Sequence, residues 1–299
     1  MARQRGRKAL GPGGIILIDK PVGPTSRNVV DDLRRQLDLP GPGHCGTLDP
    51  LASGLLILVA GHATRIQDRL TGHDKTYEAL VVFGASSLTD DAEGPFETEE
   101  KPTKPDLEAV KAVVREFVGV IEQTPPMHSA IRVDGERLYK AARRGETKEI
   151  PSRHVEIHSI DVVSYVWPNL NITVDCGSGT YIRSLARDLG EALGTKAHLG
   201  GLRRTRCGTF QIKDAKPLDD IEMGDVLSLE ACSLGWPRVE IPRSDLALFL
   251  TGRPVEVPEG LDLHDDALVC CDGQIVGRSK KLGERTLRMN RLIRRPFPT

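Results

Sequence analysis

Apolar residues recur along the chain with strand spacing in some segments and helix spacing in others. Residues 14–19 and 55–59 are nearly continuous apolar runs, which favours short strands that are buried on both faces. Residues 76–83 alternate in the period of a strand whose two faces are largely covered. Shorter runs predict further strands at 170–174, 267–271 and 274–276.

Helical spacing marks three other segments. Val29, Val30, Leu33 and Leu37 share one face, and Thr25 or Ser26 can cap the helix that carries them. Equivalent spacing predicts helices at 107–117 and from about 180 to 194. Residues 90–106 are acidic and contain proline, which predicts a surface loop.

This order of elements predicts an α+β fold. We expect a large domain with a mixed, mainly antiparallel sheet flanked by helices, followed by a small β-rich module. The pattern changes around Trp236–Pro237. The predicted division is a flexible basic arm at 1–13, a large domain at 14–236 and a small domain at 237–299. The arm is not a secretory signal, because the apolar run after it is short and ends at Asp19.

Composition excludes several classes of protein. A chain of 299 residues with 39% hydrophobic and 28% charged residues is neither wholly disordered nor fibrous. Its longest apolar run, Leu55–Ala60, is too short to span a membrane. The six cysteines form no C-x-x-C pair, which favours free thiols, a cytoplasmic location and no metal site.

The formal net charge of −1 says nothing about a polyanionic partner, so the distribution of charge decides. Basic residues gather in segment 123–153, in a cluster at 203–206 and in the tail at 278–295, where Glu284 is the single acid. Such clusters favour contact with phosphate groups. We expect segment 123–153 to be an insertion that contacts such groups.

The segment that carries candidate chemistry is 43–54, with the sequence GHCGTLDPLASG. Its glycines permit tight turns and close backbone approach to a ligand. Asp49 precedes a proline, which favours an extended backbone, and lies just before a buried strand. Two interpretations stay open on these grounds alone. Asp49 is either a reactive carboxylate or a turn-forming residue.

This segment resembles the signature of the TruB family of tRNA pseudouridine synthases. The similarity continues through further motifs in the family's order over about 190 residues. These are Lys20-Pro21-x-Gly23-x-Thr25-Ser26, Gly61-x-Ala63-Thr64, Asp74-Lys75-x-Tyr77, Gln123-x-Pro125-Pro126, Gly179-Thr180-Tyr181-Ile182-Arg183 and His198-Leu199-x-x-Leu202-Arg203-Arg204. The C-terminal stretch is similar, more loosely, to the family's RNA-binding PUA domain.

The resemblance implies isomerisation of the uridine at position 55 of the tRNA T-loop. It implies that Asp49 is the catalytic carboxylate, Arg183 its partner and Tyr77 the ring stacked on the flipped uracil. It also places Tyr181 and Leu202 in the same pocket, and Lys20 and His44 near the RNA or the loop. The expected contacts to the RNA backbone are Arg132, Arg143, Arg144, Arg203 and Arg204. An isomerisation needs no metal, redox cofactor or nucleotide cofactor. We expect the T-arm of tRNA as partner, no membrane association, and a monomer.

Alternatives remain at two positions. His44 is a general base, a wedge that fills the space left by the flipped base, or a loop residue, and we favour the wedge. Cys45 with His44 or His198 is the candidate pair of a thiol hydrolase, although nothing orders a third group around it. Two rivals remain: an RNA-binding or tRNA-folding protein without catalysis, and a synthase that acts on other RNAs.

Overall fold

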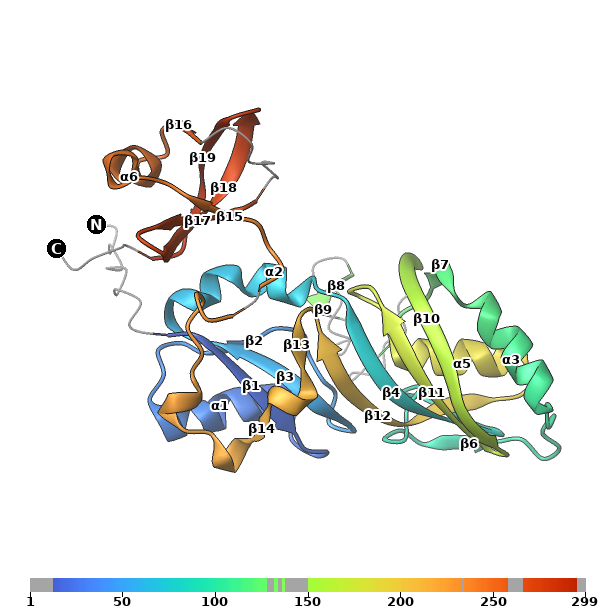
Figure 1. The fold of residues 1–299 in the computed structure, drawn as a ribbon. Helices are drawn as coiled ribbons and strands as arrows, with labels where there is room; N and C mark the ends of the chain where they lie inside the picture. The colour runs from blue at the N-terminus through green and yellow to red at the C-terminus, as the bar shows by residue number, and fades with distance from the viewer. Residues whose placement is uncertain are drawn as a thin grey trace.

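The computed structural model describes residues 13–127, 150–232, 234–257 and 266–294, together with two short strands at 132–133 and 136–137. In these residues the chain forms a large mixed sheet with helices against it and a second, smaller sheet (Figure 1). The helices are α1 Ser26–Leu37, α2 Gln67–Thr71, α3 Leu107–Glu116, α5 Ile182–Ala192 and α6 Arg243–Leu250. The short 3₁₀ turns are η1 Gly61–Ile66, η2 Ile212–Asp214, η3 Leu218–Asp220 and η4 Met223–Asp225.

The large sheet has the strand order β14-β1-β3-β12-β4-β11-β10-β7, with β2 beside β3 and β13 beside β12. The pairs β1–β14 and β3–β12 are parallel and the other pairs are antiparallel. In chain order its strands are β1 Ile15–Lys20, β2 Gly43–His44, β3 Ala52–Val59, β4 Lys75–Phe83, β7 Gly119–Gln123, β10 Arg153–Val166, β11 Asn169–Cys176, β12 Ala197–Cys207, β13 Phe210–Gln211 and β14 Lys216–Pro217. Two small hairpins pair β5 Ala85–Ser87 with β6 Phe96–Thr98, and β8 Arg132–Val133 with β9 Glu136–Arg137.

Strands β1 and β3 are buried on both faces, which explains their continuous apolar sequences. One face contributes Ile16, Ile18, Leu56 and Leu58 to a core shared with α1, α3 and α5. The other face contributes Ile15, Leu17, Leu55 and Ile57 to a second core with η1, α2 and the smaller sheet. Helix α1 begins after Thr25, whose hydroxyl accepts a hydrogen bond from Asn28 N while the Asn28 side chain accepts one from Thr25 N.

The smaller sheet has the order β15-β17-β18-β19-β16. Its strands are β15 Arg238–Glu240, β16 Val255–Glu256, β17 Leu268–Cys271, β18 Gln274–Gly283 and β19 Thr286–Leu292. Arg278, on β18, is buried and pairs with Asp68 of α2 at 2.9 Å and with Asp266. Arg69 of α2 pairs with Asp266 at 3.1 Å and lies over the Trp236 ring at 4.6 Å. The smaller sheet is thus joined to α2 by ion pairs as well as by the shared apolar core.

The fold class predicted from the sequence is confirmed, as is a helix or strand in each segment where one was predicted. The prediction of a surface loop at 90–106 is wrong in part, because Asp91 is 2% exposed and the segment includes β6. Strand β10 differs from the sequence prediction, because its first residue, Arg153, is the end of the segment predicted as an insertion. Within the described part of the chain, no helix is both long enough and apolar enough to cross a membrane.

Candidate active site

The loop that carries Asp49 is fixed by the start of α1. The buried hydroxyl of Ser26 donates to Leu48 O at 2.9 Å and accepts from Leu48 N at 2.8 Å. Gly54, with φ of +96°, is packed so closely that an added Cβ would lie 2.3 Å from Arg204 O. A larger residue there would push β3 away from β12, so the sequence after Asp49 requires glycine.

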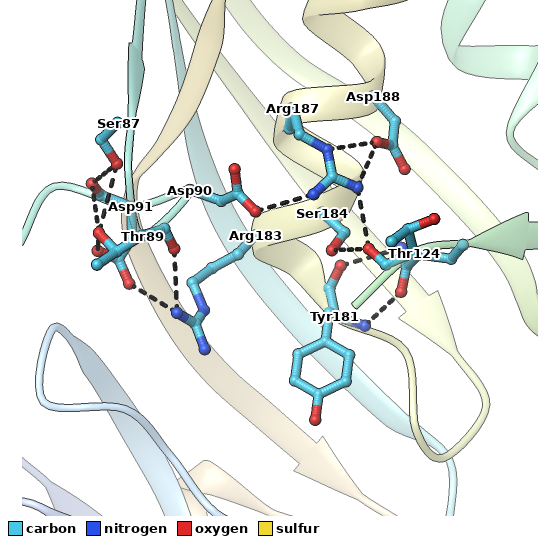
Figure 2. Close-up of polar contacts among 11 residues, drawn as sticks. Ser87, Thr89, Asp90, Asp91, Thr124, Tyr181, Arg183, Ser184, Arg187 and Asp188 are labelled. Carbon is cyan, nitrogen blue, oxygen red and sulfur yellow. Dashed lines mark hydrogen bonds and ion pairs between the residues drawn. The ribbon is translucent and has the colours of Figure 1, made fainter. Parts of the chain in front are cut away.

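Arg183 holds the centre of the site. Its Nη2 lies 3.1 Å from Asp49 Oδ2, and its Nη1 lies 3.3 Å from Asp91 Oδ2 and 3.1 Å from Thr89 O. Figure 2 shows Arg183 of α5 reaching Thr89 and Asp91. Arg183 is 5% exposed, whereas the Asp49 side chain is 37% exposed. Arg183 is therefore fixed from behind, while Asp49 stays accessible to a substrate.

The pKa of Asp49 is raised above its ordinary value. Burial of the carboxyl raises the pKa most, Arg183 opposes this, Asp91 raises it further and Lys20 lowers it. The predicted pairing with Arg183 is therefore present, but its charge does not by itself outweigh burial and the second carboxylate. Asp49 is therefore a carboxyl group whose charged form has lost part of its solvation.

Asp49 and Arg183 line a cleft of about 280 Å³ together with Tyr77, Tyr181 and Leu202, all of which the sequence placed in the site. Tyr77 is 7% exposed. Burial raises its pKa to about 12, although the nearby Arg204 guanidinium opposes the rise. The phenol is therefore protonated at neutral pH and presents a neutral ring.

The predicted RNA-backbone contact of Arg204 is wrong for a physical reason. Of the two places predicted for Lys20, near the RNA or the loop, the structure supports the loop, since Lys20 lies opposite Gly54. The Lys20 side chain is fully buried and its Nζ donates to Pro21 O and Pro24 O, both at 2.8 Å. Arg204 is 1% exposed and donates to Leu55 O at 2.7 Å and to Gly46 O at 3.2 Å. Lys20 is bonded to the turn at residues 21–24 and its charge acts on Asp49. Arg204 joins Gly46, on the loop that carries Asp49, to Leu55 of β3. Neither side chain presents its charge to an RNA backbone.

The other predicted contacts differ in their surroundings. Arg203 forms a bidentate pair with Asp19 at 2.8 and 3.1 Å and keeps 39% of its side chain exposed. His44 lies on β2 beside β3 and does not line the Asp49 cleft within the described residues. Burial and the charge of Arg204 lower the pKa of His44, so the ring is neutral near pH 7. The roles of Arg203 and His44 stay predictions.

Three predicted contacts fall in segment 123–153. Arg132 belongs to the short strand β8, and nothing further is described of its side chain. Arg143 and Arg144 lie outside the described residues. The described end of the segment contributes Arg153, which lies over the Tyr181 ring at 4.9 Å and donates to Gly179 O.

Sequence reasoning missed several residues of the site. Asp91 falls in the acidic segment that the sequence predicts as a surface loop, whereas the structure buries it to 2% exposure beside Arg183. Ser26 was considered only as a helix cap, because its contact with Leu48 is long-range. Lys75 lines the cleft and is 6% exposed, with Nζ donating to Thr71 O and His73 O. The motif containing Tyr77 includes Lys75, but no role followed from its spacing.

The rival thiol chemistry has no support in this geometry. Cys45 is fully buried, and burial strongly raises the pKa of its thiol, so a thiolate is disfavoured. Among the described residues, no group of three or more His, Cys, Asp or Glu side chains is arranged to hold a metal ion.

Comparison with known proteins connects this site to a family. The family model described as TruB family pseudouridylate synthase (N terminal domain) matches residues 34–182, and that of the tRNA pseudouridylate synthase B C-terminal domain matches residues 183–229. The tRNA pseudouridine synthase B of Mycobacteroides abscessus is 39% identical over 288 residues, covering 93% of this chain and 95% of that protein. The chain belongs to the TruB family. It is therefore an isomerase that forms pseudouridine in tRNA.

Further members of the TruB family support this assignment. The tRNA pseudouridine synthase B of Xylella fastidiosa is 43% identical over 250 residues, covering 80% of this chain and 82% of its own. Among solved structures, a chain of a Cbf5-Nop10-Gar1 complex superposes with a TM-score of 0.71 at 26% identity, covering 94% of this chain and 84% of that chain. The fold of the TruB chain is thus the fold of pseudouridine synthases.

Proposed function

We propose that the enzyme converts the uridine at position 55 of the tRNA T-loop to pseudouridine by covalent catalysis through Asp49. The observation that carries this proposal is the 3.1 Å pair between Asp49 and Arg183 at the wall of a cleft that Tyr77 and Leu202 also line. The family resemblance supplies the T-loop and its position.

The chemistry needs one nucleophile and no co-reactant. The bond between uracil N1 and ribose C1′ breaks, the base turns, and a bond forms between C5 and C1′. The proton on C5 leaves and N1 takes up a proton, so substrate and product have the same composition. The Asp49 carboxylate supplies the electron pair for a transient bond to the nucleotide and recovers it when C5 attacks. Arg183 stabilises the carboxylate whenever it is released.

To enter the cleft, the target uracil must leave the stacked bases of the folded RNA. Flipping costs a few kcal/mol, and stacking on one aromatic ring returns about 1–3 kcal/mol. Tyr77 offers such a ring and Leu202 an apolar wall. We assign to His44 the role of a wedge in the RNA, and its lowered pKa supports a neutral stacking ring rather than a cation.

The T-arm of tRNA is the proposed partner, with phosphate contacts on the module formed by residues 237–299. On its β18–β19 hairpin the exposed cations are Lys280, Lys281, Arg285, Arg288 and Arg291. Lys280 and Arg288 are directly opposite each other in the ladder, and like charges placed this way cost stability unless an anion lies across them. We propose a monomer that works in the cytoplasm, where its six free cysteines stay reduced.

The test is direct. The protein is incubated with a T-arm transcript carrying tritium at C5 of its uridines, and released tritium is measured beside mapping of pseudouridine. We expect release from position 55 with the unchanged chain and none with Asp49→Asn, which still binds the transcript. Product formed at the normal rate by Asp49→Asn would refute the assignment of the carboxylate, and product at another position would refute the T-loop.

A further inference from the structure

Two arginines one turn apart on α5 each pair with one of two adjacent aspartates. Arg183 Nη1 lies 3.3 Å from Asp91 Oδ2, and Arg187 Nη1 lies 2.9 Å from Asp90 Oδ2 (Figure 2). Side chains four residues apart share a helix face, so both can reach the same turn. Arg183 also faces Asp49, whereas Arg187 lies one turn farther along the helix. The Asp90–Asp91 turn is therefore attached to α5 at two points.

The turn at Asp90 is held by backbone contacts as well as by its side chain. Asp90 has φ of +59°, in the left-handed region that aspartate adopts more readily than most residues other than glycine. Its N donates to Ser87 O at 3.1 Å and its O accepts from Leu199 N at 3.0 Å. Its side chain is 16% exposed and paired with Arg187, so the ion pair is not a solvated surface contact.

Arg187 connects this turn to the end of β7. Its Nη2 donates to Thr124 O at 3.0 Å, and Ser184 Oγ donates to the same oxygen at 2.8 Å. One residue earlier, the Gln123 side chain donates to Tyr181 O at 3.1 Å and accepts from Tyr181 N at 2.8 Å. Three segments distant in sequence, the Asp90 turn, the end of β7 and the start of α5, thus meet behind the cleft.

We propose that Arg187 is a positioning residue for pseudouridine formation. By joining Asp90 to Thr124 it fixes the turn that carries Asp91, and this turn orients the Arg183 guanidinium toward Asp49. Arg187 is not among the described residues that line the cleft, so it acts through Asp90 and not by touching the base. The inference rests on the proposed function, because it concerns the same site.

The experiment uses the full chain with T-arm transcript and measures kcat, KM and the pH dependence of kcat. Arg187→Met removes the charge and keeps the aliphatic stem, and Asp90→Asn keeps the shape of its partner. Both are expected to lower kcat about 10- to 100-fold, since small displacements at a reacting centre have effects of this size, and to leave KM within about twofold. Arg187 also pairs with its neighbour Asp188 at 2.8 Å. Arg187→Lys, which keeps the charge but cannot reach Asp90, Thr124 O and Asp188 at once, is expected to recover part of the loss. Arg34→Met on the exposed face of α1 is the matched control.

The pH profile gives a readout that a loss of folded protein would not move. Its acidic limb reports Asp49, which faces the charges of Arg183, Asp91, Lys20 and Glu93. A less well oriented Arg183 lowers the pKa of Asp49 less, so the limb is expected to move to higher pH in Arg187→Met and Asp90→Asn.

An unchanged kcat and limb in either variant would overturn the positioning role, as would a rise in KM alone, which indicates an RNA contact. If Arg187→Met does not fold, the isosteric Asp90→Asn decides. Failure of the unchanged chain to form pseudouridine would instead refute the proposed function.

Discussion

Tyr77 and Arg204 are directly opposite each other on β4 and β12, and both line the cleft that contains Asp49. The guanidinium of Arg204 stabilises a phenolate on Tyr77, yet burial dominates and leaves the pKa of Tyr77 at about 12. The raised pKa favours one of two roles for the Tyr77 ring. A ring that stacks on a base can stay protonated, whereas a general base must be ionised before the reaction begins.

We predict that Tyr77 forms no tyrosinate up to about pH 10.5. The measurement is a difference titration of tyrosinate absorbance between the unchanged protein and Tyr77→Phe, which is favourable because the chain has only four tyrosines. A tyrosinate signal that appears below about pH 10 and is lost in Tyr77→Phe would contradict the prediction, because an unperturbed tyrosine titrates there.

Asp49→Asn is expected to lower the rate of pseudouridine formation at least about 1,000-fold, as loss of a nucleophile does.

The thermal stability of Asp49→Asn at pH 7 is expected to equal or exceed that of the unchanged protein. The reason is the sign of the pKa change: a carboxyl whose pKa is raised in the folded state favours folding when protonated, and this contribution is lost as pH rises through that pKa. A neutral amide does not have this cost. A clearly lower melting temperature would show that the ionised pair stabilises the fold.

The rate of the unchanged enzyme is expected to fall on acidification through the pKa of Asp49, which lies above the ordinary 3.8. Arg183→Met removes the cation that most opposes the rise, so the acidic limb should move to still higher pH while the maximal rate also falls. Single-turnover rates between about pH 4.5 and 8 test this. An unmoved limb would mean that another group controls it.

Thiol alkylation is expected to leave activity unchanged. Cys45, Cys176 and Cys207 are buried in the large domain, and burial raises the pKa of Cys176 to about 11. Treatment of the native enzyme with iodoacetamide, followed by mass spectrometry and the tritium-release assay, checks the prediction. Stoichiometric labelling of Cys45 with loss of activity would revive the thiol interpretation.

Transcript binding is expected to weaken steeply with salt. If about six cations contact phosphates, the log–log slope is several units negative. The double variant Lys280→Glu and Arg288→Glu should weaken binding and make the slope less negative by about two. It removes two exposed positive charges that face each other across the β18–β19 ladder. Filter binding at several salt concentrations measures both values. A slope that the double variant leaves unchanged would place the phosphate contacts elsewhere.

The resemblance to the TruB family predicted the main residues of the site, because local pattern alone left Asp49 open between a reactive carboxylate and a turn residue. Asp49, Tyr77 and Arg183 each stand in a motif that carries this resemblance, and the structure brings all three to one cleft. The β1 and β3 strands were predictable because both of their faces are apolar. A strand can be predicted from one sequence when most of its residues favour burial, as those of β1 and β3 do.

Contacts over long sequence separation account for the errors. Lys20 and Arg204 have charges that in a sequence suggest phosphate contact, but both are directed at backbone carbonyl groups inside the protein. Arg278, counted in the basic tail, is likewise paired internally with Asp68. Tertiary packing decides which group a cation pairs with, and the spacing of residues in the sequence does not reveal it.

The junction formed by Arg278, Asp68, Asp266 and Arg69 has a consequence for the proposed binding of RNA. Because apolar side chains of β1, β3 and the smaller sheet belong to one core, the two sheets should lose their structure in one cooperative transition. The distance between the basic β18–β19 hairpin and Asp49 is then set by the protein and does not adapt to the RNA. An RNA whose phosphates and reactive uridine do not match that length would have to give up one contact to make the other.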